Sequence, residues 1–130
     1  MIARDLNVFG KGGTANNSLS GYDVLVIKGK ASEPAMIDIN PEQVKISPAN
    51  HLWGLDVHET TERLSEESEP GKPQPVLCIG PAGENLVLIA AAMNDRNRAY
   101  GRSGLGAVFG SKNLKAVRVS GKRMVTSSLY

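Results

Sequence analysis

The chain has 130 residues, the size of one ordinary domain, and 41% of them are hydrophobic and 22% charged. Its single cysteine, Cys78, excludes an internal disulfide framework and a zinc or iron–sulfur site built from the thiolates of these residues alone. No stretch approaches the roughly 18 apolar residues of a membrane span, and the first residues lack the apolar region of a signal peptide. We therefore expect a cytoplasmic location and no membrane partner.

The net charge of +2 is unevenly distributed along the chain. Residues 1–95 carry 7 Lys or Arg and 13 Asp or Glu, whereas residues 96–130 carry 8 Lys or Arg and no acid. Such a split indicates an anionic partner for the basic part. The alternative is a basic surface that is balanced within the molecule by the acidic residues 59–70.

The first part of the chain predicts a loop followed by three strands. Residues 1–21 are rich in Gly, Asn and Ser and show neither the helical nor the strand period, so we expect a loop. Residues 22–30 alternate like a strand that ends at Gly29. Residues 35–40 and 44–47 predict two further strands, joined by a proline-containing turn in a hairpin or meander.

The middle of the chain predicts a helix and a connector. Asp56 can cap the helix, and Val57, Thr61 and Leu64 fall on one apolar face with charges opposite. The three prolines of residues 70–75 end the helix and predict an exposed connector.

The last part of the chain returns to strands. Residues 75–80 predict a buried strand, and residues 84–94 form an apolar run that fits a strand or a helix equally. Residues 102–113 have the small residues of a closely packed helix start, and residues 114–122 alternate as a closing strand. Strands outnumber helices and are joined by short turns. We therefore predict an α+β fold with a mainly antiparallel sheet and short helices, in a single domain over residues 1–130.

Residues 94–112 combine positive charge with a glycine-spaced run, NDRNRAYGRSGLGAVFGSK. Arg96, Arg98 and Arg102 carry planar guanidinium groups that suit phosphate oxygens. Glycines let the backbone approach a ligand, and a helix beginning near residue 103 would direct free N–H groups toward it. This pattern predicts a phosphate-like anion site. The alternative is a solvated basic turn whose glycines serve only tight packing. Nucleic acid is disfavoured, because stacking aromatics are scarce and no reader motif is present.

The other motifs give weaker evidence for a binding or catalytic site. GLGAVFG lacks the preceding strand and following acid of a dinucleotide-binding fingerprint, and no phosphate-loop order is present. His51 and His58 have no metal-ligand spacing and favour surface or capping roles. Cys78 lies in an apolar run and predicts a small core residue. Asp95 and Glu84 lie near glycines, and each is either a catalytic carboxylate or one that orients an arginine.

Several short sequence segments together resemble the aldehyde ferredoxin oxidoreductase family. They are GYDVLVIKGKASEP, HLWG, IGPAGENLV, AAMNDRNRAYGR and GLGAVFGSKNLKAVRVSG, which follow the family's order over residues 21–121. The resemblance implies an N-terminal domain of a longer enzyme. It implies tungsten or molybdenum held by two pterins, a 4Fe-4S cluster, and oxidation of aldehydes to carboxylic acids with electrons passed to ferredoxin.

Within this resemblance, the RA-x-GR stretch implies pterin-cofactor contacts at Arg98, Ala99, Gly101 and Arg102. Asn7 is a weaker candidate, because residues 1–20 depart from the family pattern, as do residues 122–130. The cluster cysteines and the acidic residues near the metal have no counterpart here, so we assign no catalytic residue and no metal ligand.

We therefore expect a pterin-binding N-terminal domain or fragment of such an enzyme, inactive alone. Its expected partners are the remaining domains or a second subunit, with ferredoxin as the family's electron acceptor and self-association through exposed apolar surface. The alternative is a non-catalytic anion-binding or interaction module with the same fold.

Overall fold

The computed structural model describes residues 7–12, 22–68 and 74–121 of the chain. Its centre is a six-stranded sheet with the order β4-β3-β8-β5-β6-β7. The pair β3–β8 is parallel, and the other four neighbouring pairs are antiparallel. The predicted α+β fold with a mainly antiparallel sheet is confirmed. The strands of this sheet are β3 (Ala35–Ile39), β4 (Val44–Pro48), β5 (Val76–Cys78), β6 (Ala92–Asn94), β7 (Arg98–Tyr100) and β8 (Leu114–Val119).

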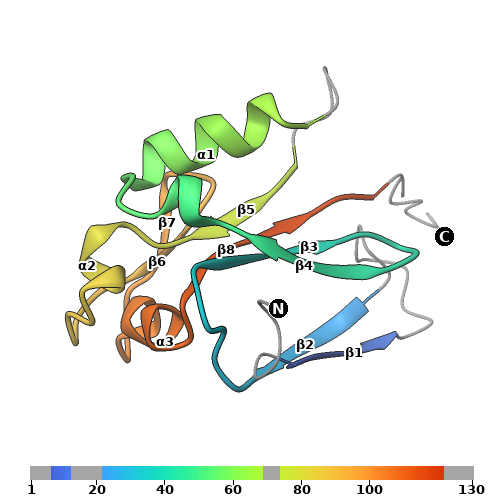
Figure 1. Ribbon diagram of the computed structural model, residues 1–130, viewed down its shortest axis with the longest axis horizontal. Helices are drawn as coiled ribbons and strands as arrows, with labels where there is room; N and C mark the ends of the chain where they lie inside the picture. The colour runs from blue at the N-terminus through green and yellow to red at the C-terminus, as the bar shows by residue number, and fades with distance from the viewer. Residues whose placement is uncertain (1–6, 13–21, 69–73, 122–130) are drawn as a thin grey trace, which may run out of the picture.

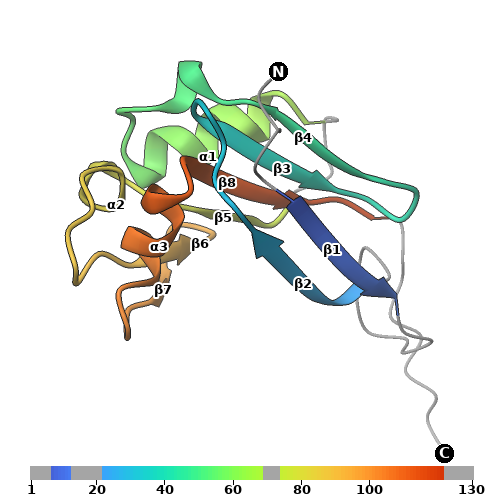
Figure 2. The same cartoon turned by 60° about the horizontal axis from the view of Figure 1, so that its bottom comes forward.

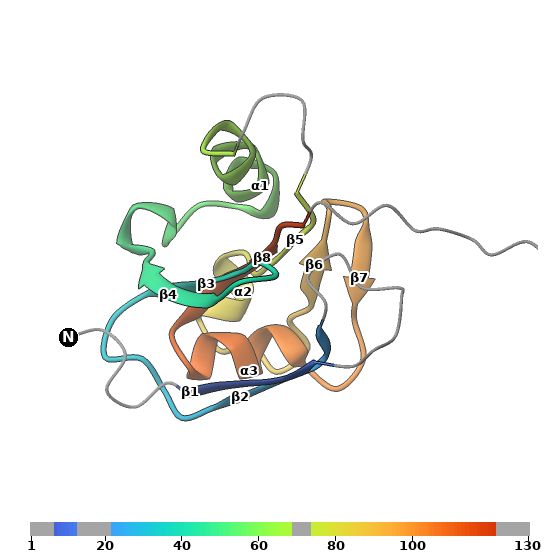
Figure 3. The ribbon, with the colours of Figure 1, turned by 90° about the vertical axis from the view of Figure 1, so that its right-hand side faces the viewer.

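The remaining elements cover the two faces of this sheet (Figure 1). Helix α1 lies over one face, and α3 and the two-stranded sheet β1–β2 lie over the other, as the end-on view shows (Figure 3). In the described part of the chain, no helix combines the length and apolar character needed to cross a bilayer. The elements outside the six-stranded sheet are β1 (Asn7–Gly12), β2 (Tyr22–Lys28), the 3₁₀ helix η1 (Asn50–Leu52), α1 (Val57–Glu66), α2 (Pro81–Glu84) and α3 (Leu105–Ser111).

Two apolar cores follow from the alternation of side chains along the strands. On the α1 side, Met36 and Ala116 pack with Leu64 of the helix, as its predicted apolar face requires. On the α3 side, Ile37 and Val117 pack with Phe109. Each face of the sheet is therefore tied to a helix by its own cluster.

Helix α1 begins as its sequence predicts, after Asp56. The Asp56 side chain accepts a hydrogen bond from the Glu59 amide at 2.8 Å, and the Glu59 carboxylate accepts one from the Asp56 amide at 3.0 Å. This reciprocal pair satisfies amides that the first turn of a helix leaves free. The predicted helix, strands and hairpin from residue 22 onward are confirmed at these positions. Of the predicted connector, residues 70–73 lie outside the described residues.

Three segments differ from their predictions. Residues 7–12 form β1, although residues 1–21 predict a loop, because the main-chain ladder with β2 needs no apolar period. Residues 1–6 and 13–21 lie outside the described residues. The apolar run 84–94 is neither one helix nor one strand, since turns connect α2 to the short strand β6. Residues 98–100, predicted as part of a basic loop, form the edge strand β7.

A β-bulge places Lys115 inside the protein. Ala35 pairs with Leu114 and Met36 pairs with Ala116, so Lys115 is an extra residue on β8. A bulge re-aims a side chain in this way. The Lys115 side chain is fully buried and forms an ion pair with Glu84, whose side chain is 5% exposed. Lys115 Nζ also donates to the Leu55 carbonyl at 2.8 Å.

The Glu84 carboxylate completes this buried polar cluster. Its two oxygens lie 3.0 and 2.9 Å from the amide nitrogen of Gly54, which donates to them. The cluster thus ties β8 and α2 to the turn that precedes α1. A buried charge is tolerated only when it is paired and hydrogen-bonded, and both charges here are.

Helices α2 and α3 are in backbone contact. A Cβ atom on Gly110 would overlap the carbonyl oxygen of Gly83, and one on Gly106 would lie 2.6 Å from the carbonyl oxygen of Ala91. These glycines are therefore required by close packing rather than by an unusual backbone conformation. The position of α2, which Glu84 fixes, consequently fixes α3.

We expect Gly110→Ala to lower the free energy of unfolding by about 2 kcal/mol, because the added methyl group must push α2 and α3 apart. Chemical denaturation monitored by circular dichroism measures this change. Gly101→Ala is the matched control, since nothing lies within 4 Å of a Cβ atom at that position. Equal stability of the two variants would show that the helices can separate without cost.

We expect Lys115→Met to lower the free energy of unfolding by about 3–5 kcal/mol, because it leaves the Glu84 carboxylate buried without its partner. The exposed Lys45→Met is the control. In the double variant Lys115→Met/Glu84→Gln, the uncompensated charge is gone, so the loss should be smaller than in Lys115→Met alone. A double variant that is less stable than Lys115→Met would contradict this account of the pair.

Candidate functional site

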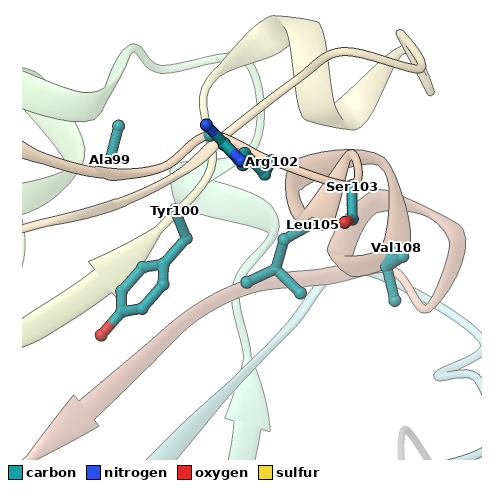
Figure 4. Close-up of a pocket in the computed structure, with 7 residues that line it drawn as sticks. Ala99, Tyr100, Arg102, Ser103, Leu105 and Val108 are labelled. Atoms are coloured by element: carbon teal, nitrogen blue, oxygen red, sulfur yellow. The ribbon is translucent and has the colours of Figure 1, made fainter.

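An open groove of about 500 Å³ lies between β7 and the start of α3 (Figure 4). Within it, Ala99 and Tyr100 point in opposite directions, as neighbours on a strand do, and Arg102 lies on the side toward which Ala99 points. The groove thus contains three of the four predicted cofactor-binding residues, whereas Arg98 lies on β7 outside the lining. The lining residues are Ala99, Tyr100, Gly101, Arg102, Ser103, Leu105 and Val108.

The hairpin turn before β7 is fixed by Asp95. Its amide donates to the Val76 carbonyl at 3.0 Å, and its carboxylate accepts a hydrogen bond from the Val76 amide at 3.0 Å. Asp95 and Arg96 have φ values of 46° and 71°, in the left-handed region that non-glycine residues rarely adopt. The carboxylate of Asp95 therefore stabilises a turn, and it pairs with no arginine among the residues that the structure describes.

The other end of the groove is fixed by a run of left-handed backbone at Ser103 and Gly104, with φ values of 68° and 65°. A Cβ atom on Gly104 would overlap the carbonyl oxygen of Leu88. Both the left-handed backbone and the lack of space for a side chain therefore require a glycine at this position. The segment 98–102 is thus held at both ends and exposed between them. Backbone in rare conformations often accompanies ligand sites, where surrounding structure holds it in place.

The three arginines of this segment have different surroundings. Arg96 lies 3.5 Å from the carboxylate of Glu62 on α1. Arg98 and Arg102 are exposed, and neither has a carboxylate partner among the residues that the structure describes. Arg102, which lines the groove, and Arg98, which lies beside it on β7, therefore carry charge that is available to a ligand.

The sequence leaves open whether the glycines of this segment allow a ligand to approach or serve only tight packing. The structure shows that they differ in this respect. Gly104, Gly106 and Gly110 serve tight packing, as the alternative interpretation holds. Gly101 does not, because nothing lies within 4 Å of a Cβ atom there and the residue faces the groove. Bare backbone at Gly101 is therefore free to approach a ligand.

The start of α3 lies close to residue 103, where the sequence predicts the beginning of a helix that directs free N–H groups at a ligand. Helix α3 begins at Leu105, and the amide of Gly106 donates to the Ala90 carbonyl at 2.9 Å. One amide at the helix start is thus engaged within the protein. The edge strand β7 offers further main-chain donors, since an edge strand leaves alternate amides unpaired by its sheet.

The remaining candidate residues lie away from the groove or are buried. His51 is half exposed, 3.3 Å from Glu67, and His58 is exposed on α1, so surface positions are confirmed for both. Cys78 is fully buried, as predicted, and burial raises the pKa of its thiol. Glu84 pairs with Lys115. Sequence reasoning missed Lys115, because nothing in an alternating strand pattern marks a bulge.

Among the described residues, no cluster of three or more His, Cys, Asp or Glu side chains is placed to hold a metal ion. The chemistry of the groove itself is that of an anion site with an apolar wall.

Comparison with known proteins identifies relatives that are much longer than this chain. Residues 6–121 match the family described as aldehyde ferredoxin oxidoreductase, N-terminal domain. A tungsten-containing aldehyde ferredoxin oxidoreductase of Pyrococcus furiosus is 49% identical over 111 residues, which cover 85% of this chain and 18% of that protein. The corresponding protein of Thermococcus kodakarensis is 46% identical over the same lengths.

Two further relatives carry other names. The WOR-like subunit of an aliphatic sulfonate oxidoreductase of Pyrococcus furiosus is 37% identical over 113 residues, covering 78% of this chain and 18% of that protein. The solved active-site complex BamBC of benzoyl coenzyme A reductase, bound to 1,5-dienoyl-CoA, superposes with a TM-score of 0.72 at 41% identity. The match covers 81% of this chain and 16% of that one. This chain belongs to the aldehyde ferredoxin oxidoreductase family and corresponds to its N-terminal domain.

Proposed function

We propose that this chain forms the part of an aldehyde ferredoxin oxidoreductase-like enzyme that holds a tungsten- or molybdenum-pterin cofactor. The observation that carries the proposal is the groove beside residues 98–102, where two arginines without carboxylate partners adjoin unobstructed backbone at Gly101. In this proposal Arg98, Ala99, Gly101 and Arg102 contact the anionic part of the cofactor.

The residues of the groove fit such a group. A phosphate needs forked cationic donors and main-chain amides, which Arg102 and the edge strand β7 supply. A flat ring system needs an apolar wall, which Tyr100, Leu105 and Val108 supply along the same groove. The space at Gly101 lets a ligand approach the main chain more closely than any side chain would allow.

The names of the relatives support cofactor binding rather than substrate selection. They refer to aldehydes, an aliphatic sulfonate and benzoyl coenzyme A, yet all of these proteins share a domain similar to this one. What this domain contributes should therefore be common to enzymes with different substrates. Binding and orienting a common cofactor meets that requirement.

The roles of the individual residues follow from their chemistry. Arg98 and Arg102 neutralise and orient the anionic end of the cofactor, and the main chain at Ala99 and Gly101 fixes its depth in the groove. When bound, the cofactor supplies the two-electron oxidation of an aldehyde to a carboxylic acid. We assign no catalytic residue to this chain, and its one cysteine is buried, so a 4Fe-4S cluster and ferredoxin contacts belong to other parts of the enzyme.

The test uses a chimera in which this chain's sequence replaces the aligned 111-residue segment of the Pyrococcus furiosus relative. The chimera and the isolated chain are purified anaerobically from cells supplied with tungstate or molybdate. Elemental analysis measures the metal, and fluorescence of the oxidised pterin measures the cofactor. A folded chimera with neither metal nor pterin would refute the proposal. Phosphate retained by the isolated chain, with no pterin in the chimera, would favour the anion-binding module instead.

We expect Arg102→Lys in the chimera to weaken cofactor retention about tenfold or more, because a lysine cannot replace a bidentate guanidinium–phosphate contact. The measurement is the pterin remaining after dialysis, relative to the unsubstituted chimera. Arg63→Lys on the exposed face of α1 is the matched control and should retain the cofactor fully. If Arg102→Lys retains as much pterin as Arg63→Lys, Arg102 is not a phosphate ligand.

A further inference from the structure

Residues 86–89 form an exposed turn of four aliphatic side chains, which we call the apolar turn. Leu88 is 85% exposed and Ile89 is 84% exposed, and Leu86 and Val87 are 51% and 42% exposed. Single exposed apolar residues are common on protein surfaces, but four consecutive ones form a patch that marks an interaction site.

The apolar turn is held in one conformation. The amide of Leu86 donates to the Gly83 carbonyl at 3.0 Å, and the amide of Ala90 donates to the Val87 carbonyl at 2.8 Å. On the inner side, the Leu88 carbonyl lies against Gly104, where a Cβ atom would overlap it. The backbone of this turn is thus packed inward and the side chains of Leu88 and Ile89 are held outward, whereas the Leu86 side chain lies partly against Gly110 of α3. A preformed surface costs less conformational entropy on binding than a mobile loop would.

The location and charge of the apolar turn limit what can cover it. It lies at the end of the molecule formed by α2, α3 and β7, away from β1 and β2, in both Figure 1 and Figure 2. Residues 85–94 carry no charged side chain, so the turn offers nothing to an acidic or a basic partner. Its partner surface must therefore be apolar.

We propose that the apolar turn inserts into an apolar depression on the polypeptide that the relatives carry beyond this domain. Those relatives use only 16–18% of their length for the segment that matches this chain, so most of each protein must pack elsewhere. The turn adjoins, through Gly104, the same α3 start that borders the groove. A polypeptide that covers the groove would therefore also lie next to this turn. The identity of the partner rests on the proposed function, whereas the exposure of the turn does not.

Cysteine labelling tests this inference directly. Leu88→Cys is introduced into the isolated chain and into the chimera, and maleimide labelling is followed by peptide mass spectrometry. We expect labelling at position 88 to be about tenfold slower in the folded chimera than in the isolated chain, because contacts at an interface exclude solvent. Glu66→Cys, on the charged outer face of α1, is the matched control and should label at the same rate in both. The native Cys78 is fully buried and should stay unlabelled in both folded proteins.

The possible outcomes separate the alternatives. Equal labelling at position 88 in both proteins would overturn the proposal. Protection in the isolated chain that grows with its concentration, together with a dimer in light scattering, would identify a second copy as the occupant and would also overturn it. The readout does not require cofactor, so a chimera that lacks pterin can still show protection at position 88.

A second variant keeps the inference testable if the chimera does not fold. Leu88→Ser/Ile89→Ser in the isolated chain should change Tm by less than about 3 °C, because exposed side chains contribute little to stability. It should also reduce any self-association of the isolated chain. A large loss of Tm would show that these side chains pack within this domain, and the proposed interface would be withdrawn.

Discussion

The buried ion pair of Lys115 and Glu84 fixes the geometry on which the groove depends. It joins β8, α2 and the turn before α1, three segments that are far apart in the sequence. Through Gly83 and Gly110, the position of α2 determines that of α3, and the start of α3 is one border of the groove. Because an unpaired charge in this position is strongly destabilising, the arrangement has little freedom to relax. A rigid groove is what a cofactor site requires.

The uneven charge of the chain can reflect an anionic partner or ion pairs within the molecule. The structure shows which basic residues form such internal ion pairs. Arg96 pairs with Glu62, Lys115 with Glu84, and Arg118 with Asp38, whose carboxylate accepts from Arg118 Nε at 2.6 Å. In each pair a base from the acid-free part of the chain meets an acid from the acidic part. These pairs involve three of the eight Lys and Arg residues of the segment 96–130. They leave the charge of Arg102 at the groove and that of Arg98 beside it.

One end of the domain gathers three features that would be costly in a free-standing protein. The groove exposes arginines without carboxylate partners, β7 exposes a strand edge, and the apolar turn exposes four aliphatic side chains. Close backbone contact at Gly104 joins the apolar turn to the start of α3, and the Asp95 turn and pairing with β6 hold β7. In the proposed function, cofactor binding would account for the first two, and contact with the rest of a longer enzyme would account for the third. The shared domain in relatives named for different substrates agrees with this division.

The sequence by itself determined the strands β2, β3, β4, β5 and β8, the capped start of helix α1, the fold class and the family, because periodicity, caps and contiguous motifs are all local properties. It also identified the arginine–glycine segment as a candidate anion site. Only the tertiary structure decided that residues 98–100 form an edge strand, that Asp95 fixes a turn, and that an apolar run faces outward. It likewise revealed the bulge that buries Lys115. Each of these depends on which distant backbone a residue meets, and no local pattern encodes such a contact.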